Sequence, residues 1–122
     1  MIRLNSYSYG CRKNYELKDT TTKDYIGRCC VIENVILGKG KCVNEIWNVR
    51  IFEPFQRKGY ATLMLKRIIS KYKKEAEPLV LYVYKDNEIA IHLYEKMGFK
   101  IIGEYDNGRS DTWAMQYTKK GA

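Results

Sequence analysis

With 122 residues, of which 45% are hydrophobic, the chain is large enough for one domain (residues 1–122) with its own core, which excludes a disordered chain. No apolar run approaches the length of a membrane span, and the first residues lack the apolar region of a secretory signal, so we expect a cytoplasmic protein without a membrane partner. The net charge of +8 suits an anionic ligand or an acidic partner, but the scattered basic residues match no nucleic-acid-binding motif, so we do not expect nucleic-acid binding.

The first half of the chain is rich in β-branched and aromatic residues with a period of two, which predicts strands. We expect these strands at Ile2–Tyr9, Tyr15–Lys18, Asp24–Glu33 and Val43–Phe52. A turn is expected near Gly10 to Asn14. The signal Gly38-Lys39-Gly40-Lys41 indicates a hairpin, and it lacks the pattern of a Walker phosphate loop.

After the fourth strand the apolar period changes to 3.6, which predicts a helix that Pro78 cannot continue. Its apolar stripe consists of Ala61, Leu65, Ile68 and Tyr72. The continuous apolar run Leu79–Tyr84 is typical of a strand covered on both faces.

A second helix is predicted by a capping signature at Asp86-Asn87-Glu88, an apolar stripe and a stop at Gly98. Two final strands, Lys100–Tyr105 and Thr112–Thr118, flank a polar turn at Asp106-Asn107-Gly108. The order of elements suggests an α/β (α+β) domain with a single mixed sheet and helices packed on it. A right-handed crossover from Val43 to Tyr84 should make the two strands that it joins parallel.

The run Phe55-Gln56-Arg57-Lys58-Gly59-Tyr60-Ala61-Thr62 lies between a strand and a helix. Two basic residues, a glycine and small residues at a helix start expose several backbone N–H groups at one point. Those groups and the helix dipole form a candidate site for phosphate.

Two segments resemble the motifs of the GNAT acetyltransferases. Gln56 to Ala61 fits the family pattern Q/R-x-x-G-x-G/A, and Asn87 to Phe99 fits N-x-x-A-x-x-L-Y-x-K-x-G-F. The second motif is long and specific, and together they cover roughly Val43 to Tyr105, about half of the chain. The resemblance implies the acyl-CoA N-acyltransferase fold, a mostly antiparallel twisted sheet of about seven strands with two main helices.

The resemblance also implies a site for acetyl-CoA as cosubstrate, with no metal. The coenzyme would lie in a V-shaped gap between the fourth strand and Leu79–Tyr84. Strand backbone would pair with the pantetheine arm, and N–H groups at the helix start would hold the pyrophosphate. The implied contacts are Val49, Ile51, Gln56, Arg57, Lys58, Gly59, Tyr60, Ala61, Thr62, Asn87 and Tyr94. As alternatives, Arg57 and Lys58 are solvated and Asn87 only caps its helix.

Two catalytic candidates follow from the same resemblance. Tyr94 matches a tyrosine that donates a proton to the departing thiolate, and its alternative role is packing the helix on the sheet. Glu45 matches the place of a base glutamate, with proton removal through water as the alternative. Glu53 is a weaker base candidate, and His92 falls on a polar helix face, where we expect it to be solvated.

Two further residue sets leave alternatives open. Trp47 and Asn48 either line the acceptor side of the site or occupy core or edge positions. The four cysteines contain no C-x-x-C pair, so reduced, mostly buried thiols are expected; the alternative is a reactive or dimer-linking cysteine.

The chain departs from many GNAT members because only about six residues, Ser8 to Lys13, separate its first two strands. The family's usual helices at this point, which cover the acceptor, are missing, so the chain resembles a short form. An open acceptor site favours a protein or other large acceptor, or completion by a second subunit. An exposed final strand would also suit a homodimer.

These features predict an N-acetyltransferase that moves the acetyl group of acetyl-CoA directly to a primary amine. The acceptor is a protein or peptide lysine, an N-terminus or a small-molecule amine. The alternative is a non-catalytic acyl-CoA-binding or protein-interaction module with the same fold.

Overall fold

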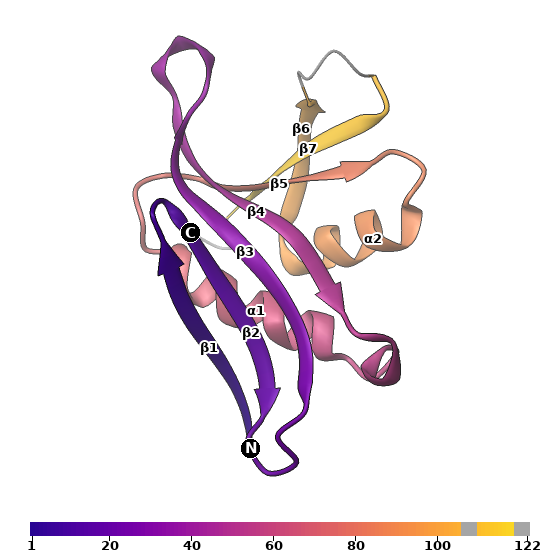
Figure 1. The fold of residues 1–122 in the computed structure, drawn as a ribbon. Helices are drawn as coiled ribbons and strands as arrows, with labels where there is room; N and C mark the ends of the chain where they lie inside the picture. Colours follow the sequence, from indigo (N-terminus) through magenta and orange to yellow (C-terminus); the bar gives the residue numbers. More distant parts are fainter. Residues whose placement is uncertain (106–109, 119–122) are drawn as a thin grey trace.

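A computed structural model describes residues 1–105 and 110–118, so the polar turn expected at 106–108 lies outside the described residues. Seven strands form one sheet in the order β1-β2-β3-β4-β5-β7-β6, and only β4 and β5 are parallel neighbours (Figure 1). The elements are β1 (Ile2–Tyr9), β2 (Arg12–Asp19), β3 (Tyr25–Ile36), η1 (Gly38–Gly40), β4 (Cys42–Ile51), η2 (Glu53–Phe55), α1 (Tyr60–Tyr72), β5 (Leu79–Tyr84), α2 (Glu88–Met97), β6 (Phe99–Glu104) and β7 (Thr112–Tyr117).

The mixed, mostly antiparallel sheet with two main helices confirms the predicted fold class, and the crossover through α1 does join parallel strands. The expected turn at Gly10 to Asn14 was too long, because β2 already begins at Arg12. Its polar first residues pair with β1 and β3, so long-range hydrogen bonding extends the strand beyond the apolar pattern. Gly10 makes this tight turn possible with a φ of +62°.

The final strand is not an exposed edge, so it does not offer the homodimer contact that an exposed final strand would suit. The last strand, β7, lies between β5 and β6 and pairs with both. The edges of the sheet are therefore β1 and β6. Strand order depends on pairing between distant segments, which a local pattern does not encode.

Both helices pack on the same face of the sheet. Figure 1 shows α1 lying across the strands of the N-terminal half. The side chains that α1 buries are Met64, Leu65, Ile68, Ile69 and Tyr72, and α2 adds Leu93, Tyr94 and Met97 to the same core. The opposite face carries no helix among the described residues, and we call it the open face.

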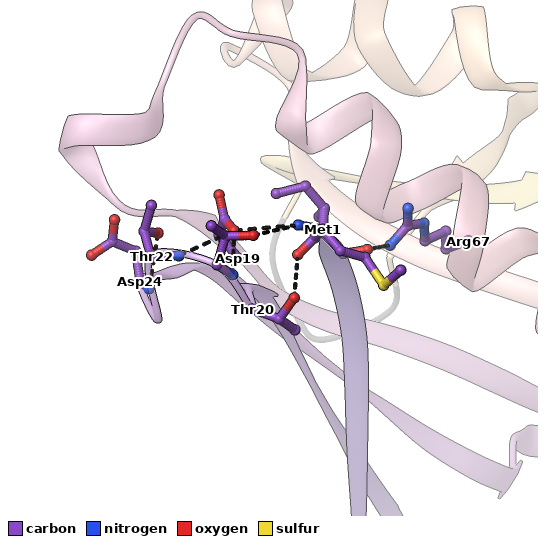
Figure 2. A network of polar contacts seen from close by, with 8 residues as sticks. Met1, Asp19, Thr20, Thr22, Asp24 and Arg67 are labelled. Atoms are coloured by element: carbon purple, nitrogen blue, oxygen red, sulfur yellow. Dashed lines mark hydrogen bonds and ion pairs between the residues drawn. The ribbon is translucent and has the colours of Figure 1, made fainter.

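The edge strand β1 is fastened to the rest of the fold near its start (Figure 2). Arg67 of α1 donates from Nη1 to the carbonyl of Ile2 at 2.9 Å, and Thr20 Oγ1 donates to the carbonyl of Met1 at 3.0 Å. The backbone N–H of Thr21 donates to Asp19 Oδ1 at 2.9 Å and lowers the pKa of that carboxyl. These bonds hold the edge strand in register with its neighbour.

Strands β4 and β5 separate soon after they meet. They pair only at Asn44–Ile46 with Leu79–Leu81. Near the point of separation β4 has a bulge, where Asn48 adopts a φ of +57° and the pairing with β3 shifts between Arg28 and Cys30.

Neither α1 nor α2, the α-helices of the described residues, has the length and apolar character needed to cross a bilayer.

Candidate active site

A cavity of about 310 Å³ lies where β4 and β5 diverge. Ile46, Leu81 and Val83 line it from the helix-covered face, while Trp47 and Tyr82, at alternate strand positions, line it from the open face. Its other walls are Asn48, Val49, Tyr84, Asn87, Tyr94, Tyr105 and Thr112. Side chains from both faces of the sheet therefore meet at this cavity.

Within the described residues, the β4 edge beside this cavity pairs with no strand beyond Ile46. Arg50 and Ile51 pair with β3 on the other side, and β5 has already turned away. An unpaired strand edge presents N–H and C=O groups that an extended ligand with amide groups can pair with. The observed geometry thus fits the expected pantetheine contact with residues 49–51.

The turn that follows β4 leads directly into α1 with its first N–H groups free. Gln56 closes the turn, since its Nε2 donates to the carbonyl of Ile51 at 3.0 Å. The first intrahelical bond runs from Leu63 N to the carbonyl of Gly59 at 3.1 Å, and no side chain caps the helix. Among the described residues, no acceptor serves the N–H groups of 60–62, so they remain available to an anion.

Gly59 is required in this turn by its backbone conformation. Its φ is +83°, in the left-handed region that disfavours a side chain. A Cβ built on Gly59 would meet no described atom within 4 Å, so a side chain here would not clash with the rest of the protein. The space in front of Gly59 is open, as close approach of a ligand to the backbone requires.

Asn87, the N-cap of α2, and Tyr94 within α2 both line the cavity. Asn87 Oδ1 accepts from Ala90 N at 3.2 Å, so the capping role is present. Within the described residues the amide nitrogen of Asn87 forms no hydrogen bond, so it can donate to a ligand in the cavity that Asn87 lines. Tyr94 is half-buried with its ring 6.2 Å from that of Phe99, and burial raises the pKa of its phenol. Both the packing role and the chemical role of Tyr94 are therefore possible in one position.

Glu45 lies buried on the open face, with 6% of its surface exposed. Its carboxylate accepts from Tyr82 Oη at 2.5 Å and from Trp47 Nε1 at 2.9 Å. Burial, and then the bond to Glu45, raise the pKa of Tyr82, whose ring stacks on Tyr105 at 4.0 Å. Glu45 itself does not line the cavity, so Tyr82 and Trp47 stand between its carboxylate and a ligand.

The remaining candidates lie apart from the gap. Glu53 is exposed in η2 and His92 is exposed on α2, and neither lines the cavity. Arg57 and Lys58 are exposed beside the phosphate turn. Trp47 and Asn48 do line the cavity, and their place on the acceptor side of the site stays a prediction.

Sequence patterns did not single out Tyr82 or Tyr105. Tyr82 lies inside a continuous apolar run. A tyrosine buried in such a strand needs a hydrogen-bond partner for its hydroxyl, and this need was the available signal that Tyr82 contacts a polar side chain. For Tyr105 no local signal exists, because its contact with Tyr82 depends on how the C-terminal strands return to β5.

Comparison with known proteins agrees with this architecture. The model of the family described as Acetyltransferase (GNAT) family matches residues 10–99, which is more than half of the chain. The chain is 33% identical over 76 residues to the chloroplastic GCN5-related N-acetyltransferase 6 of Arabidopsis thaliana, covering 60% of this chain. It is 38% identical over 55 residues to the uncharacterized N-acetyltransferase YdgE of Bacillus subtilis, covering 44% of this chain. The chain belongs to the GNAT acetyltransferase family.

Solved structures show the same fold over nearly the whole chain. A GNAT family acetyltransferase from Elizabethkingia anophelis with acetyl-CoA bound aligns with a TM-score of 0.76 at 18% identity, over 97% of this chain and 98% of that one. Spermidine N-acetyltransferase from Vibrio cholerae, in complex with CoA and spermine, aligns with a TM-score of 0.69 at 25% identity, over 88% and 65% of the two chains. The matched segment spans only 26% and 35% of the two curated relatives.

Proposed function

We propose that this protein is an acetyl-CoA-dependent N-acetyltransferase that transfers the acetyl group directly to a primary amine. The observation that carries the proposal is the cavity between β4 and β5. The cavity is bordered by the edge of β4 that pairs with no described strand, by Asn87 and by Tyr94. From the cavity, β4 runs to the start of α1, where the first N–H groups have no acceptor among the described residues. Family membership and the acetyl-CoA bound by a protein of the same fold support this assignment.

The donor side of the site is built mainly from backbone. An extended pantetheine arm suits the unpaired edge of β4, and the pyrophosphate suits the N–H groups of 60–62 with the positive end of the helix dipole. When bound, acetyl-CoA supplies an acetyl group activated as a thioester. Asn87, with its amide nitrogen uncommitted, provides a side-chain donor at the cavity wall.

Tyr94 is the proposed proton donor. Burial raises the pKa of its phenol, so Oη keeps its proton at neutral pH. At the cavity wall this hydroxyl can give the proton to a departing thiolate. The tyrosine then regains a proton from solvent through the open side of the cavity.

Glu45 is the proposed base, and its reach is indirect. An ammonium must lose a proton before its nitrogen can attack a carbonyl. The Glu45 carboxylate contacts the cavity only through Tyr82 Oη and Trp47 Nε1, so an ordered water or Tyr82 must connect it with the amine. Removal of the proton by water alone is the alternative.

A non-catalytic acyl-CoA-binding or protein-interaction module is the second candidate function. Release of free coenzyme A thiol from acetyl-CoA should be measured with a panel of amines, peptides and proteins. We expect release that depends on both the protein and an acceptor. Binding of acetyl-CoA without thiol release from any acceptor would favour the module.

The acceptor and the assembly are further proposals. Proteins of the same fold include a spermidine N-acetyltransferase from Vibrio cholerae and NAA60 from Arabidopsis thaliana, which was solved with a bisubstrate analogue. The open face, which carries no helix among the described residues, suits a protein or other large acceptor or a site completed in a homodimer. We also keep the cytoplasmic location as a proposal, to be tested by fractionating cells that produce the protein.

A further inference from the structure

A second cavity, of about 500 Å³, lies on the open face and borders the first. The two cavities share Asn48 and Val49, the residues of the β4 bulge. Strands β1 to β4 supply its walls, which are Tyr7, Arg12, Asn14, Tyr15, Glu16, Arg28, Cys29, Cys30, Asn48, Val49 and Arg50. A ligand in this cavity would therefore reach the divergence of β4 and β5 from the side opposite the helices.

Three arginines dominate the charge of this cavity. Arg28 and Arg50 are direct cross-strand partners, an arrangement in which like charges repel. Both guanidinium groups lie beside the same ring, with their Cζ atoms 5.9 and 5.7 Å from the centre of Phe52. The guanidinium groups of Arg28 and Arg50 therefore lie close together, and both contact the ring of Phe52.

Arg12 completes the group from β2. Its Nε donates to Asn14 Oδ1 at 3.1 Å, and its terminal nitrogens form no hydrogen bond with the residues that the structure describes. Asn14 and Asn48 add two amide groups to the walls. The cavity therefore offers several hydrogen-bond donors within one concave surface.

These positive charges have little compensation within the protein. Neither of the two ion pairs formed in residues 1–105 and 110–118 involves Arg12, Arg28 or Arg50. Among the described residues of the cavity wall, Glu16 is the one carboxylate, and although it faces Arg28 across the strands, the two form no ion pair. A fork of guanidinium groups without carboxylate partners matches the geometry of a carboxylate or phosphate ligand.

We propose that this arginine cavity binds an anionic group of the acceptor, so that the acceptor is a small amine bearing a carboxylate or a phosphate. The inference rests on the proposed function, because it takes the gap between β4 and β5 as the place of acetyl transfer. The anion is held by Arg12, Arg28 and Arg50, and the amine extends past the bulge at Asn48 into the gap. Polycationic amines are repelled by the same charges, which separates this chain from spermidine acetyltransferases of the same fold.

Four small amines test the proposal: ethanolamine, O-phosphoethanolamine, β-alanine and spermidine. The first three place a primary amine two carbons from a hydroxyl, a phosphate or a carboxylate. Binding should be measured by calorimetry or NMR with coenzyme A present, so that the phosphate turn at α1 is occupied and no turnover occurs. We expect at least one anionic amine to bind roughly tenfold or more tightly than ethanolamine, since a charge-assisted bond contributes about 1.5–3 kcal/mol. Comparing phosphate with carboxylate identifies the preferred anion.

The matched variants are Arg28→Gln with Arg50→Gln, and Lys74→Gln as a control that removes a positive charge from an exposed site outside the cavity. The double arginine variant should lose the preference for the anionic amine, and Lys74→Gln should keep it. Because all three side chains are exposed, folding should be preserved, which thermal unfolding checks.

Two binding results would overturn the proposal: spermidine or ethanolamine binding as tightly as both anionic amines, or an unchanged preference in the double arginine variant. Thiol release from acetyl-CoA with the same amines then tests the proposed function separately. Anion-dependent binding without thiol release from any acceptor would leave the arginine cavity standing and contradict the enzyme. Release with spermidine alone would support the enzyme and reject the arginine cavity.

Discussion

Two tyrosines at the same cavity differ in what their hydroxyl groups do. Tyr82 Oη is committed to the Glu45 carboxylate at 2.5 Å, so its proton serves a buried acceptor. Tyr94 Oη forms no hydrogen bond within the described residues, and its phenol borders the gap. Of the two, Tyr94 therefore has the proton that a ligand in the gap can receive.

Replacing Tyr94→Phe should lower kcat on the order of 100-fold while changing the affinity for coenzyme A little, because the ring is retained and only the proton donor is lost. Steady-state kinetics with a productive acceptor and coenzyme A binding measure the two effects. Tyr9→Phe, on an 81% exposed side chain of the edge strand, is the matched control and should behave as wild type. An unchanged kcat would mean that Tyr94 is structural.

At the level of elements, the turn between β4 and α1 offers an internal control. Gly59 and Gly10 both adopt a positive φ, and a Cβ at either would meet no atom within 4 Å. A substitution should thus cost similar backbone strain at both sites. Gly59, however, precedes the free N–H groups of α1, whereas Gly10 lies in the β1–β2 turn.

Gly59→Glu should weaken coenzyme A binding by roughly 100-fold or more, through steric block and repulsion of the pyrophosphate. Gly10→Glu should bind coenzyme A as wild type does, although both variants lose comparable stability. Calorimetric titration and thermal unfolding measure the two quantities. Equal affinity of both variants would contradict the phosphate-turn assignment.

The start of α2 combines a cap with a candidate ligand contact, and two substitutions separate them. Asn87→Asp keeps the oxygen that accepts from Ala90 N but removes the amide donor, so stability should hold while coenzyme A binds more weakly. Asn87→Ala should lose the same affinity and also about 1 kcal/mol of unfolding free energy. Denaturant unfolding and coenzyme binding are the readouts. Full affinity in the Asp variant would leave Asn87 as a cap only.

At the scale of the whole molecule, a buried polar network joins α1 to two strands of the sheet. Tyr72 Oη lies 2.8 Å from Tyr15 Oη and donates to Glu33 Oε2 at 2.5 Å. Burial, followed by the bond to Glu33, raises the pKa of Tyr72 above its usual value near 10. The folded protein therefore retains this proton at a pH where the unfolded chain releases it, and stability is lost as pH rises above about 10.

Tyr72→Phe should lower the unfolding free energy by about 1–3 kcal/mol at neutral pH, because the buried Tyr15 hydroxyl loses its partner. Above pH 10 the variant should lose stability less steeply than wild type, by up to about 1.4 kcal/mol per pH unit. Denaturant unfolding between pH 7 and about 11 measures both effects. An identical alkaline slope in the two proteins would show that Tyr72 ionises alike in the folded and unfolded chains.

Local pattern was sufficient for most of the elements. The bounds of β1 and β5 agree with the predicted strands, and Asn87 and Gly98 bound α2 as their capping chemistry indicated. Pattern was insufficient where pairing decides the outcome: β2 begins three residues before the expected strand, at Arg12 rather than Tyr15, and β7 lies inside the sheet. Hydrogen bonds from a neighbouring strand order polar residues that no hydrophobic period marks.

By itself, the sequence determined the family and predicted the donor side of the site, because motif glycines, caps and helix starts act through their own backbone over a few residues. Only the tertiary structure decided which side chains border the two cavities. Arg12, Arg28 and Arg50 stand far apart in the chain and look like scattered surface charge, yet sheet register and the bulge at Asn48 bring them together. Long-range pairing sets that register, so the acceptor side follows from the folded sheet.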